Sequence, residues 1–267
     1  DGDTLTITAR TNGAKGVVTI TGGGTGLTYK PNANLNGSDS FTYTISDGKG
    51  GSSTGTVDVT INPVNDDPVA VTDSKTVAED SGPTAINVLA NDSDIDGDDL
   101  DITGKTNGTK GVVTITGGGG GLTYQPNANA NGSDSFEYTI DDDNGGTAIG
   151  IVNVTITPAN DLPTADDDSI TLAEDAPATA VPVLVGDADI DGDTLAITAK
   201  TNGTKGVVTI TGGGTGLTYK PDKDLNGADS FTYTISDGKG GTASATVSVT
   251  ITPVNDAPFA VTDSKTV

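Results

Sequence analysis

Alternating aspartates form a recurring loop that could bind a hard cation. The loop is NDSDIDGDD at residues 91–99 and GDADIDGD at residues 186–193, and Asp1-Gly2-Asp3 is its remnant at the start of the sequence. Carboxylates at alternate positions of a glycine-containing loop converge and repel each other unless a cation lies between them. The pattern favours calcium, because magnesium retains its waters and rarely uses a site built from protein alone. The alternative is a solvated acidic turn.

Composition excludes most other chemistry. The 267 residues include 13 Lys and Arg against 37 Asp and Glu, a formal net charge of −24, and all but three of the acids (Glu79, Glu137 and Glu174) are Asp. This charge repels phosphate backbones and anionic lipids, so neither nucleic acid nor membrane insertion is expected. Cys and His are absent, which removes thiol nucleophiles, imidazole bases and zinc sites. We expect calcium as the cofactor and no enzymatic activity.

Two other interpretations of the acidic loop are disfavoured by the sequence. From Asp92 the twelfth position is Thr103, and from Asp187 it is Thr198, so the bidentate glutamate of an EF-hand is missing. A glycosidase carboxylate pair at Asp92 and Asp94, or within residues 141–143, is disfavoured as well. Asp92, Asp94 and Asp142 recur one period later as Asp187, Asp189 and Asp237, and aromatic residues that could stack on a sugar are scarce.

The elements that position these loops belong to one repeated unit. DGDTLTITARTNGAKGVVTI begins at Asp1, and near-identical segments begin at Asp96 and Asp191, an offset of 95 residues each time. Proline-bounded hinges, PVNDDP (63–68), PANDLP (158–163) and PVNDAP (253–258), separate the units. We predict a partial unit at residues 1–66, whole units at 67–161 and 162–256, and the start of another at 257–267.

The first unit lacks the positions of two opening strands, so we expect it to be a piece of a longer chain. Without those strands, Ile7, Phe41 and Val59 should be exposed.

A whole unit contains seven short segments that alternate apolar and polar residues, the pattern of half-buried strands. In the second unit they lie near residues 69–77, 85–89, 100–103, 112–116, 122–124, 135–140 and 147–157. The pattern predicts an all-β fold of immunoglobulin-like, seven-stranded antiparallel Greek-key sandwiches in a linear array. The core is small, so an additional stabilising element is expected. The predicted inward residues are Val71, Ile86, Val88, Leu100, Ile102, Val113, Ile115, Leu122, Tyr124, Phe136, Tyr138, Ile140, Val152, Val154 and Ile156.

Several motifs together resemble a known family. VAED (77–80), VLANDSD (88–94), FEYTIDD (136–142), VNVTI (152–156) and NDLP (160–163) follow the order of cadherin repeat motifs. Units of this length with NDAP hinges and DSFTYTISDGKGG strands resemble the cadherin-like, immunoglobulin-like tandem repeats of giant bacterial surface adhesins of the RTX type. The resemblance covers essentially the whole chain.

The resemblance implies calcium at the hinges, because cadherins bind calcium between successive domains. At the first hinge the implied ligands are Asn65, Asp66, Asp92, Asp94 and Asp142, and at the second they are Glu79, Asn160, Asp161, Asp187, Asp189 and Asp237. Asp96 and Asp191 of the acidic loops, and Glu174, Asn255 and Asp256 at the third hinge, complete the candidate metal ligands. Asn129 and Asn131 replace the cadherin D-R-E acids. One or two ions per hinge are therefore expected, with dissociation constants of about 10⁻⁴–10⁻³ M.

The function implied is a calcium-rigidified spacer of a long extracellular adhesin or surface filament, which supports cell adhesion or biofilm formation by extension. Repeated units with near-identical surfaces favour a role in extending the chain, because each unit contacts its neighbours in the chain. Other copies in a filament are additional candidate partners. Two alternatives remain: repeats that themselves bind a glycan or protein, and a polymerising subunit of an extracellular filament.

Overall fold

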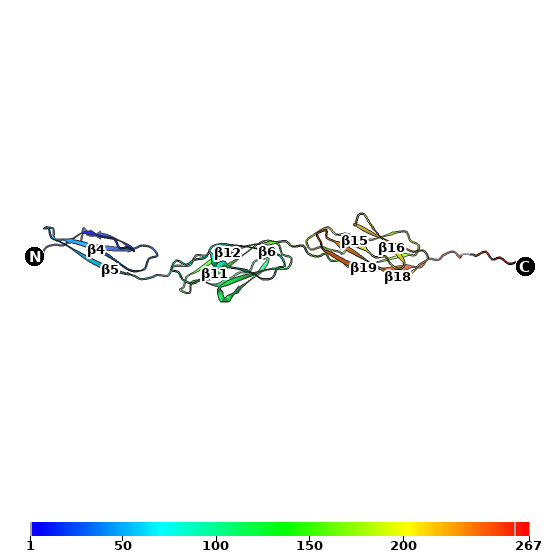
Figure 1. The fold of residues 1–267 in the computed structure, drawn as a ribbon, viewed down its shortest axis with the longest axis horizontal. Helices are drawn as coiled ribbons and strands as arrows, with labels where there is room; N and C mark the ends of the chain where they lie inside the picture. The colour runs from blue at the N-terminus through cyan, green and yellow to red at the C-terminus, as the bar shows by residue number, and fades with distance from the viewer. Residues whose placement is uncertain (1, 259, 267) are drawn as a thin grey trace. The chain divides into compact units, whose positions relative to one another are not determined.

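The structure is a computed structural model that describes residues 2–258 and 260–266. The chain folds as two compact units, residues 1–158 and 159–267. Strands joined by short turns build both units (Figure 1). Within the described residues, no helix has the length and apolar character needed to cross a membrane.

The second repeat is a seven-stranded sandwich, as the alternating pattern predicts. Its elements are β6 (Asp73–Ala78), β7 (Thr84–Ile86), the 3₁₀ turn η1 (Val88–Ala90), β8 (Asp101–Lys105), β9 (Gly111–Thr116), the 3₁₀ turn η2 (Gly117–Gly119), β10 (Gly121–Pro126), β11 (Gly132–Asp141) and β12 (Thr147–Thr157). One sheet has the order β6-β12-β11-β8 and the other β7-β10-β9. The all-β, immunoglobulin-like fold class is confirmed.

The third repeat has the same plan. Its strands are β13 (Asp168–Ala173), β14 (Thr179–Val181), β15 (Ala196–Lys200), β16 (Gly206–Thr211), β17 (Gly216–Pro221), β18 (Gly227–Ser236) and β19 (Thr242–Thr252). They form the sheets β13-β19-β18-β15 and β14-β17-β16.

The first repeat contains five described strands, β1 (Thr6–Arg10), β2 (Gly16–Thr21), β3 (Gly26–Pro31), β4 (Gly37–Ser46) and β5 (Ser52–Ile61). They form the sheets β1-β4-β5 and β2-β3. Ile7 and Val59, which were expected to be exposed, are half-buried. The expected exposure of Phe41 is wrong: its ring is 5% exposed because it stacks on Tyr29, with ring centroids 5.9 Å apart.

In each whole repeat, one strand pair departs from the antiparallel expectation. β6 runs parallel to β12, with Asp73 opposite Val152 and Ala78 opposite Thr157, and β13 pairs with β19 in the same way. The other pairs, including β11 with β12, are antiparallel. The first and last strands of a repeat both run from the hinge before the repeat (its entry end) toward the hinge after it (its exit end). They are therefore parallel where they pair.

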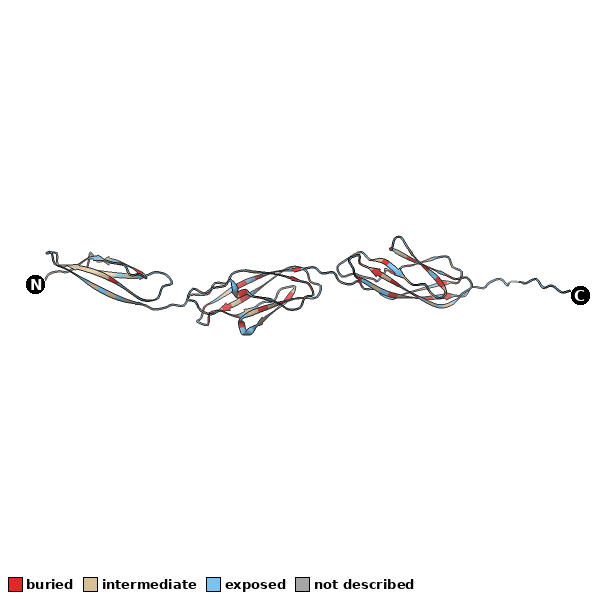
Figure 2. Ribbon diagram, viewed as in Figure 1, coloured by how far each residue is buried: buried red, intermediate tan, exposed pale blue. Residues whose placement is uncertain are grey.

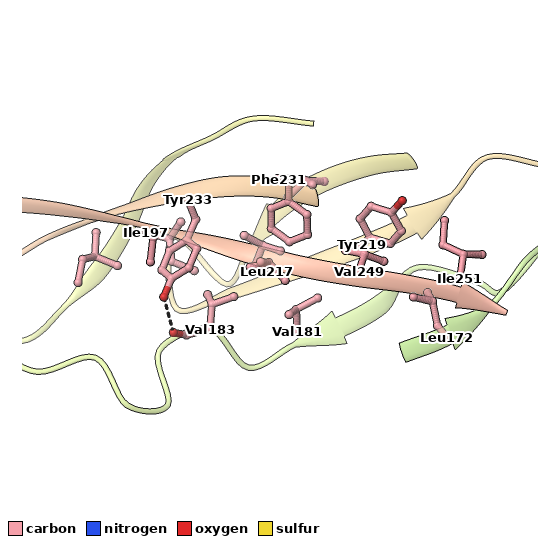
Figure 3. Packing of buried hydrophobic residues seen from close by; sticks show 14 residues of the cluster. Leu172, Val181, Val183, Ile197, Leu217, Tyr219, Phe231, Tyr233, Val249 and Ile251 are labelled. Atoms are coloured by element: carbon pink, nitrogen blue, oxygen red, sulfur yellow. Dashed lines mark hydrogen bonds between the residues drawn. The ribbon is translucent and has the colours of Figure 1, made fainter. Parts of the chain in front are cut away.

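The core lies between the two sheets of each whole repeat, where Figure 2 shows the buried positions on the strands. Most predicted inward residues of the second repeat are buried. Val71 is an error, because it is 43% exposed and precedes β6, and Val77 is buried instead at 5% exposure. In the third repeat, the rings of Phe231 and Tyr219 stack with their centroids 5.7 Å apart (Figure 3).

A half-buried aspartate links the two sheets of every repeat. Asp134 on β11 accepts a hydrogen bond from the hydroxyl of Tyr124 on β10, with an O–O distance of 2.7 Å. The same carboxylate accepts the backbone N–H groups of Thr109 and Lys110, so it also fixes the turn before β9. Equivalent bonds join Tyr29 to Asp39 and Tyr219 to Asp229. This Tyr–Asp clamp is an additional stabilising element that the repeat pattern did not predict.

Candidate metal centre

Three segments meet at the entry end of the second repeat: the hinge, the acidic loop before β8, and the turn between β11 and β12. The Asn65 side chain donates to Asp142 Oδ2 at 2.8 Å, and the backbone N–H of Asp66 donates to Asp96 Oδ2 at 2.8 Å. Val69 and Ser93 exchange backbone hydrogen bonds of 2.8 and 3.1 Å. The hinge is therefore held directly against the acidic residues.

The acidic loop curls around Asp94. Its Oδ1 accepts the backbone N–H groups of Asp96, Gly97 and Asp98 at 2.7, 3.1 and 3.4 Å. Gly97 has a φ of +84°, which side-chain-bearing residues rarely adopt and which lets the loop turn back on itself. This turn directs the loop carboxylates inward.

Three carboxylates converge as a result. Asp94, Asp98 and Asp142 each offer an oxygen, and these atoms lie within 4.8 Å of one another. Asp142 is 1% exposed. The other oxygen of Asp94, Oδ2, is buried and has no hydrogen-bond partner among the described residues. A buried charged oxygen without a partner is costly, and neighbouring carboxylates add repulsion.

Asp142 is held in its charged form. The hydrogen bond from the Asn65 side chain lowers its pKa, and the backbone N–H groups of Asn144 and Gly146 contribute, although burial opposes them. In the third repeat the Asn160 side chain lowers the pKa of Asp237 in the same way, through a 2.8 Å hydrogen bond. A charged, buried carboxylate is a suitable calcium ligand.

The entry end of the third repeat reproduces this arrangement with one change. The N–H of Asp161 donates to Asp191 Oδ2 at 2.8 Å, and Asp189 Oδ1 accepts from Asp191 and Asp193. Here the converging carboxylates are those of Asp189, Asp191 and Asp193. Oδ2 of Asp189 and Oδ2 of Asp193 are buried without a hydrogen-bond partner in the described part of the chain.

Asp92 and Asp187, both predicted ligands, face another direction. Asp92 accepts the N–H of Val71 at 2.7 Å and the hydroxyl of Tyr138 at 3.0 Å. Burial raises the pKa of Tyr138, and the hydrogen bond to Asp92 raises it further. The hydroxyl therefore stays protonated and donates. Asp187 makes the corresponding bonds to Asp166 and Tyr233. These two aspartates thus fasten the loop to the core.

The predicted glutamates lie at the exit end of their repeats. Glu79 and Glu174 are 3% and 5% exposed. Their Oε2 atoms accept the side-chain amides of Asn131 and Asn226, at 3.2 and 3.1 Å, and Glu174 Oε1 accepts the N–H of Val254 at 2.6 Å. Each glutamate thereby ties the end of its sandwich to a neighbouring turn.

At the third hinge, the Asn255 side chain donates to the backbone carbonyl of Asp256. The Asp256 carboxylate lies near those of Asp175 and Asp224, and all three residues are exposed.

Two converging residues, Asp98 and Asp193, were missing from the predicted ligands. Each lies two positions after a predicted one, in the same Asp-Gly-Asp segment. That continued alternation was the signal for them. All the donors at both entry ends are oxygen atoms and carry negative charge, which is the set that a hard divalent cation prefers and that a transition metal does not require.

The fold defines the chain as a series of immunoglobulin-like sandwiches, and carboxylates that could hold a cation cluster at the entry ends of the whole repeats. The chain belongs to the bacterial Ig domain family, whose sequence model matches residues 1–60, 65–155 and 160–250. No curated protein sequence matches the chain.

Solved cadherin structures share the fold. Mouse cadherin-23 EC22-24 is 15% identical, with a TM-score of 0.64 over 95% of this chain and 89% of that one. Protocadherin gamma B2 extracellular cadherin domains 1–5 are 17% identical, with a TM-score of 0.58 over 95% of this chain. The chain spans about half (53%) of that protocadherin. At these identities the likeness concerns the fold alone.

Proposed function

We propose that the chain is a spacer segment of an extracellular surface protein, stiffened by calcium bound at the entry end of each whole repeat. The observation that carries the proposal is the pair of buried, unpartnered oxygens, Asp94 Oδ2 and Asp189 Oδ2, which occupy equivalent positions within the described repeats. Two independent copies of a costly feature indicate a cation that compensates for it.

The residues that would hold calcium are Asp94, Asp98 and Asp142 in the second repeat and Asp189, Asp191 and Asp193 in the third. When bound there, calcium would neutralise the clustered carboxylates. The hinge residues already hydrogen-bond to the same ends, through Asn65 and Asp66 in one case and Asn160 and Asp161 in the other. Neutralising these ends would remove the repulsion between them and the hinge carboxylates of Asp66 and Asp161, which would hold each hinge to its repeat and restrict bending.

The spacer role rests on repetition. Matching units with near-identical surfaces provide length, whereas a recognition unit would need a distinctive loop. Bacterial Ig and cadherin-like domains are usually extracellular, which supports a cell-surface location. The partners proposed are the neighbouring repeats and other copies in a surface filament, with adhesion or biofilm formation as the purpose of the extension.

Calcium should raise the melting temperature of the chain. An ion at 100 times its dissociation constant stabilises the folded state by about 2.7 kcal/mol per site. Calorimetry in millimolar calcium and in chelator should show this gain for the wild type. The double variant Asp94→Asn/Asp189→Asn should lose most of it, because each change removes a charged ligand.

The matched control is Asp58→Asn/Asp222→Asn, which removes the same charge at two exposed positions. It should retain the gain. Identical wild-type melting curves with and without calcium would contradict the proposal, and so would an undiminished gain in the Asp94/Asp189 variant.

A further inference from the structure

The turn after the long central strand differs between the two entry ends, and one of its differing positions carries a positive charge in the third repeat. Residue 239 of the third repeat is Lys, and the equivalent residue of the second repeat is Asn144. The Lys239 ammonium lies 2.7 Å from Asp193 Oδ1. Asn144 donates its backbone N–H and its side-chain amide to Asp142, at 2.8 and 3.3 Å. The third site thus contains a positive charge from the chain itself, and the second contains a neutral amide.

The ammonium acts on the whole carboxylate group of the third site. Its hydrogen bond to Asp193 raises the pKa of Lys239, and the charges of Asp193, Asp191 and Asp189 add to that effect. The Lys239 side chain is 59% exposed, whereas that of Asp193 is 14% exposed. The lysine therefore covers the site from its solvent side and can swing away without disturbing the core. In the first repeat, Lys49 pairs with Asp3 in the same manner.

The surrounding charge enlarges the difference. The turn at residues 141–144 is DDDN and contains three carboxylates, whereas residues 236–239 are SDGK and contain one carboxylate and one ammonium. A cation approaching the second repeat meets a more negative field than one approaching the third.

We infer that the two calcium sites are unequal: Lys239 is a built-in counter-ion that competes with calcium at the third repeat, while the second repeat, with Asn144, depends on calcium for neutralisation. The inference rests on the proposed function and concerns its regulation. The second site fills at lower calcium concentration than the third, so the hinges stiffen in two stages. Without calcium, the third entry end remains the better ordered of the two.

A reciprocal exchange of the two residues tests the inference. In calcium titrations by calorimetry at low ionic strength, the full chain should show a tighter and a weaker phase. Lys239→Asn should strengthen the weaker phase on the order of tenfold, because one nearby positive charge is removed. Asn144→Lys should weaken the tighter phase by a similar factor. Lys220→Gln is the matched control, since it also exchanges an exposed lysine of the third repeat for the residue of the second and should change neither phase.

Melting in chelator provides a second measurement. Lys239→Asn should lower the melting temperature of the calcium-free chain, and Asn144→Lys should raise it. If calcium binds but the exchange moves neither the titration phases nor the calcium-free melting temperature, the inference is wrong and the calcium-spacer proposal stands. If the wild type shows neither binding heat nor a gain in melting temperature, the proposed function itself fails.

Discussion

Asp229 shows how much a single carboxylate can organise in this small sandwich. It accepts four hydrogen bonds, two from Thr204 and one each from the N–H of Lys205 and the hydroxyl of Tyr219, at 2.6 to 3.1 Å. Burial alone would raise its pKa, but the bonds from Tyr219 and the 204–205 turn outweigh burial and lower the pKa to about 2. This clamp requires no calcium, so it should contribute stability in chelator as well.

The clamp predicts a specific dependence on pH. The folded pKa of Asp229, about 2, lies below the value near 3.9 expected in the unfolded chain. Its contribution is therefore complete above about pH 4 and is lost as the pH falls toward 2. In chelator at pH 7, Asp229→Asn should cost on the order of 3 kcal/mol, because charged hydrogen bonds are lost. The difference from wild type should shrink between pH 4 and pH 2 in thermal melts.

Asp263→Asn, which removes the same charge from an exposed position, is the control and should melt like the wild type throughout. A stability difference between Asp229→Asn and wild type that is as large at pH 2 as at pH 5 would show that the charged clamp is not its source.

The Tyr–Asp clamp depends on the glycine that begins the strand before the tyrosine, which is Gly16 of β2, Gly111 of β9 and Gly206 of β16. A Cβ added to Gly111 would lie 2.3 Å from Cζ of Tyr124, and the same is true of Gly16 against Tyr29. Gly111→Ala should therefore displace the ring and break its bond to Asp134, at a cost of about 2 kcal/mol. Denaturant unfolding measures this effect.

Gly82→Ala is the control in the same repeat, because its Cβ would meet nothing within 4 Å. It should leave the unfolding midpoint nearly unchanged. Equal midpoints for Gly111→Ala and Gly82→Ala would argue against a packed tyrosine at this place.

The strands themselves could be predicted, because period-two alternation directly reports a half-buried sheet. Strand partners could not, since alternation says which face of a strand is buried and not which neighbour it has. The parallel pairing of β6 with β12 was therefore not predicted. The predicted burial of Val71 is wrong for a related reason, because an apolar residue just before a strand need not follow the alternation of that strand. The clamp did leave a signal: Tyr29/Asp39, Tyr124/Asp134 and Tyr219/Asp229 recur at one spacing of ten residues.

The sequence predicted where the candidate cation sites lie, but only some of the residues that form them. The alternating aspartates and the Asn-Asp hinges indicate where a cation would bind, and the structure brings Asp94 and Asp142 together. It turns Asp92 toward Tyr138 instead. Side-chain direction within a tight loop depends on backbone torsions such as that of Gly97, which a residue pattern does not specify.

The overall charge of the molecule bears on the stiffness of its hinges. A net charge of −24 is unfavourable for any arrangement that brings acidic ends close together. Calcium at the entry ends would offset this repulsion locally and attach each hinge to the repeat that follows it. The end-to-end distance of the chain and the stiffness of its hinges would then depend on the calcium concentration.

Small-angle X-ray scattering of the wild-type chain during a calcium titration measures whether bound calcium stiffens the hinges. We expect the scattering of a flexible chain in chelator to change to that of a stiffer, more extended chain in millimolar calcium. Matched magnesium should have a much smaller effect. Superimposable scattering curves in chelator and in calcium, under conditions where calorimetry registers calcium binding, would contradict the claim that the bound ion stiffens the hinges.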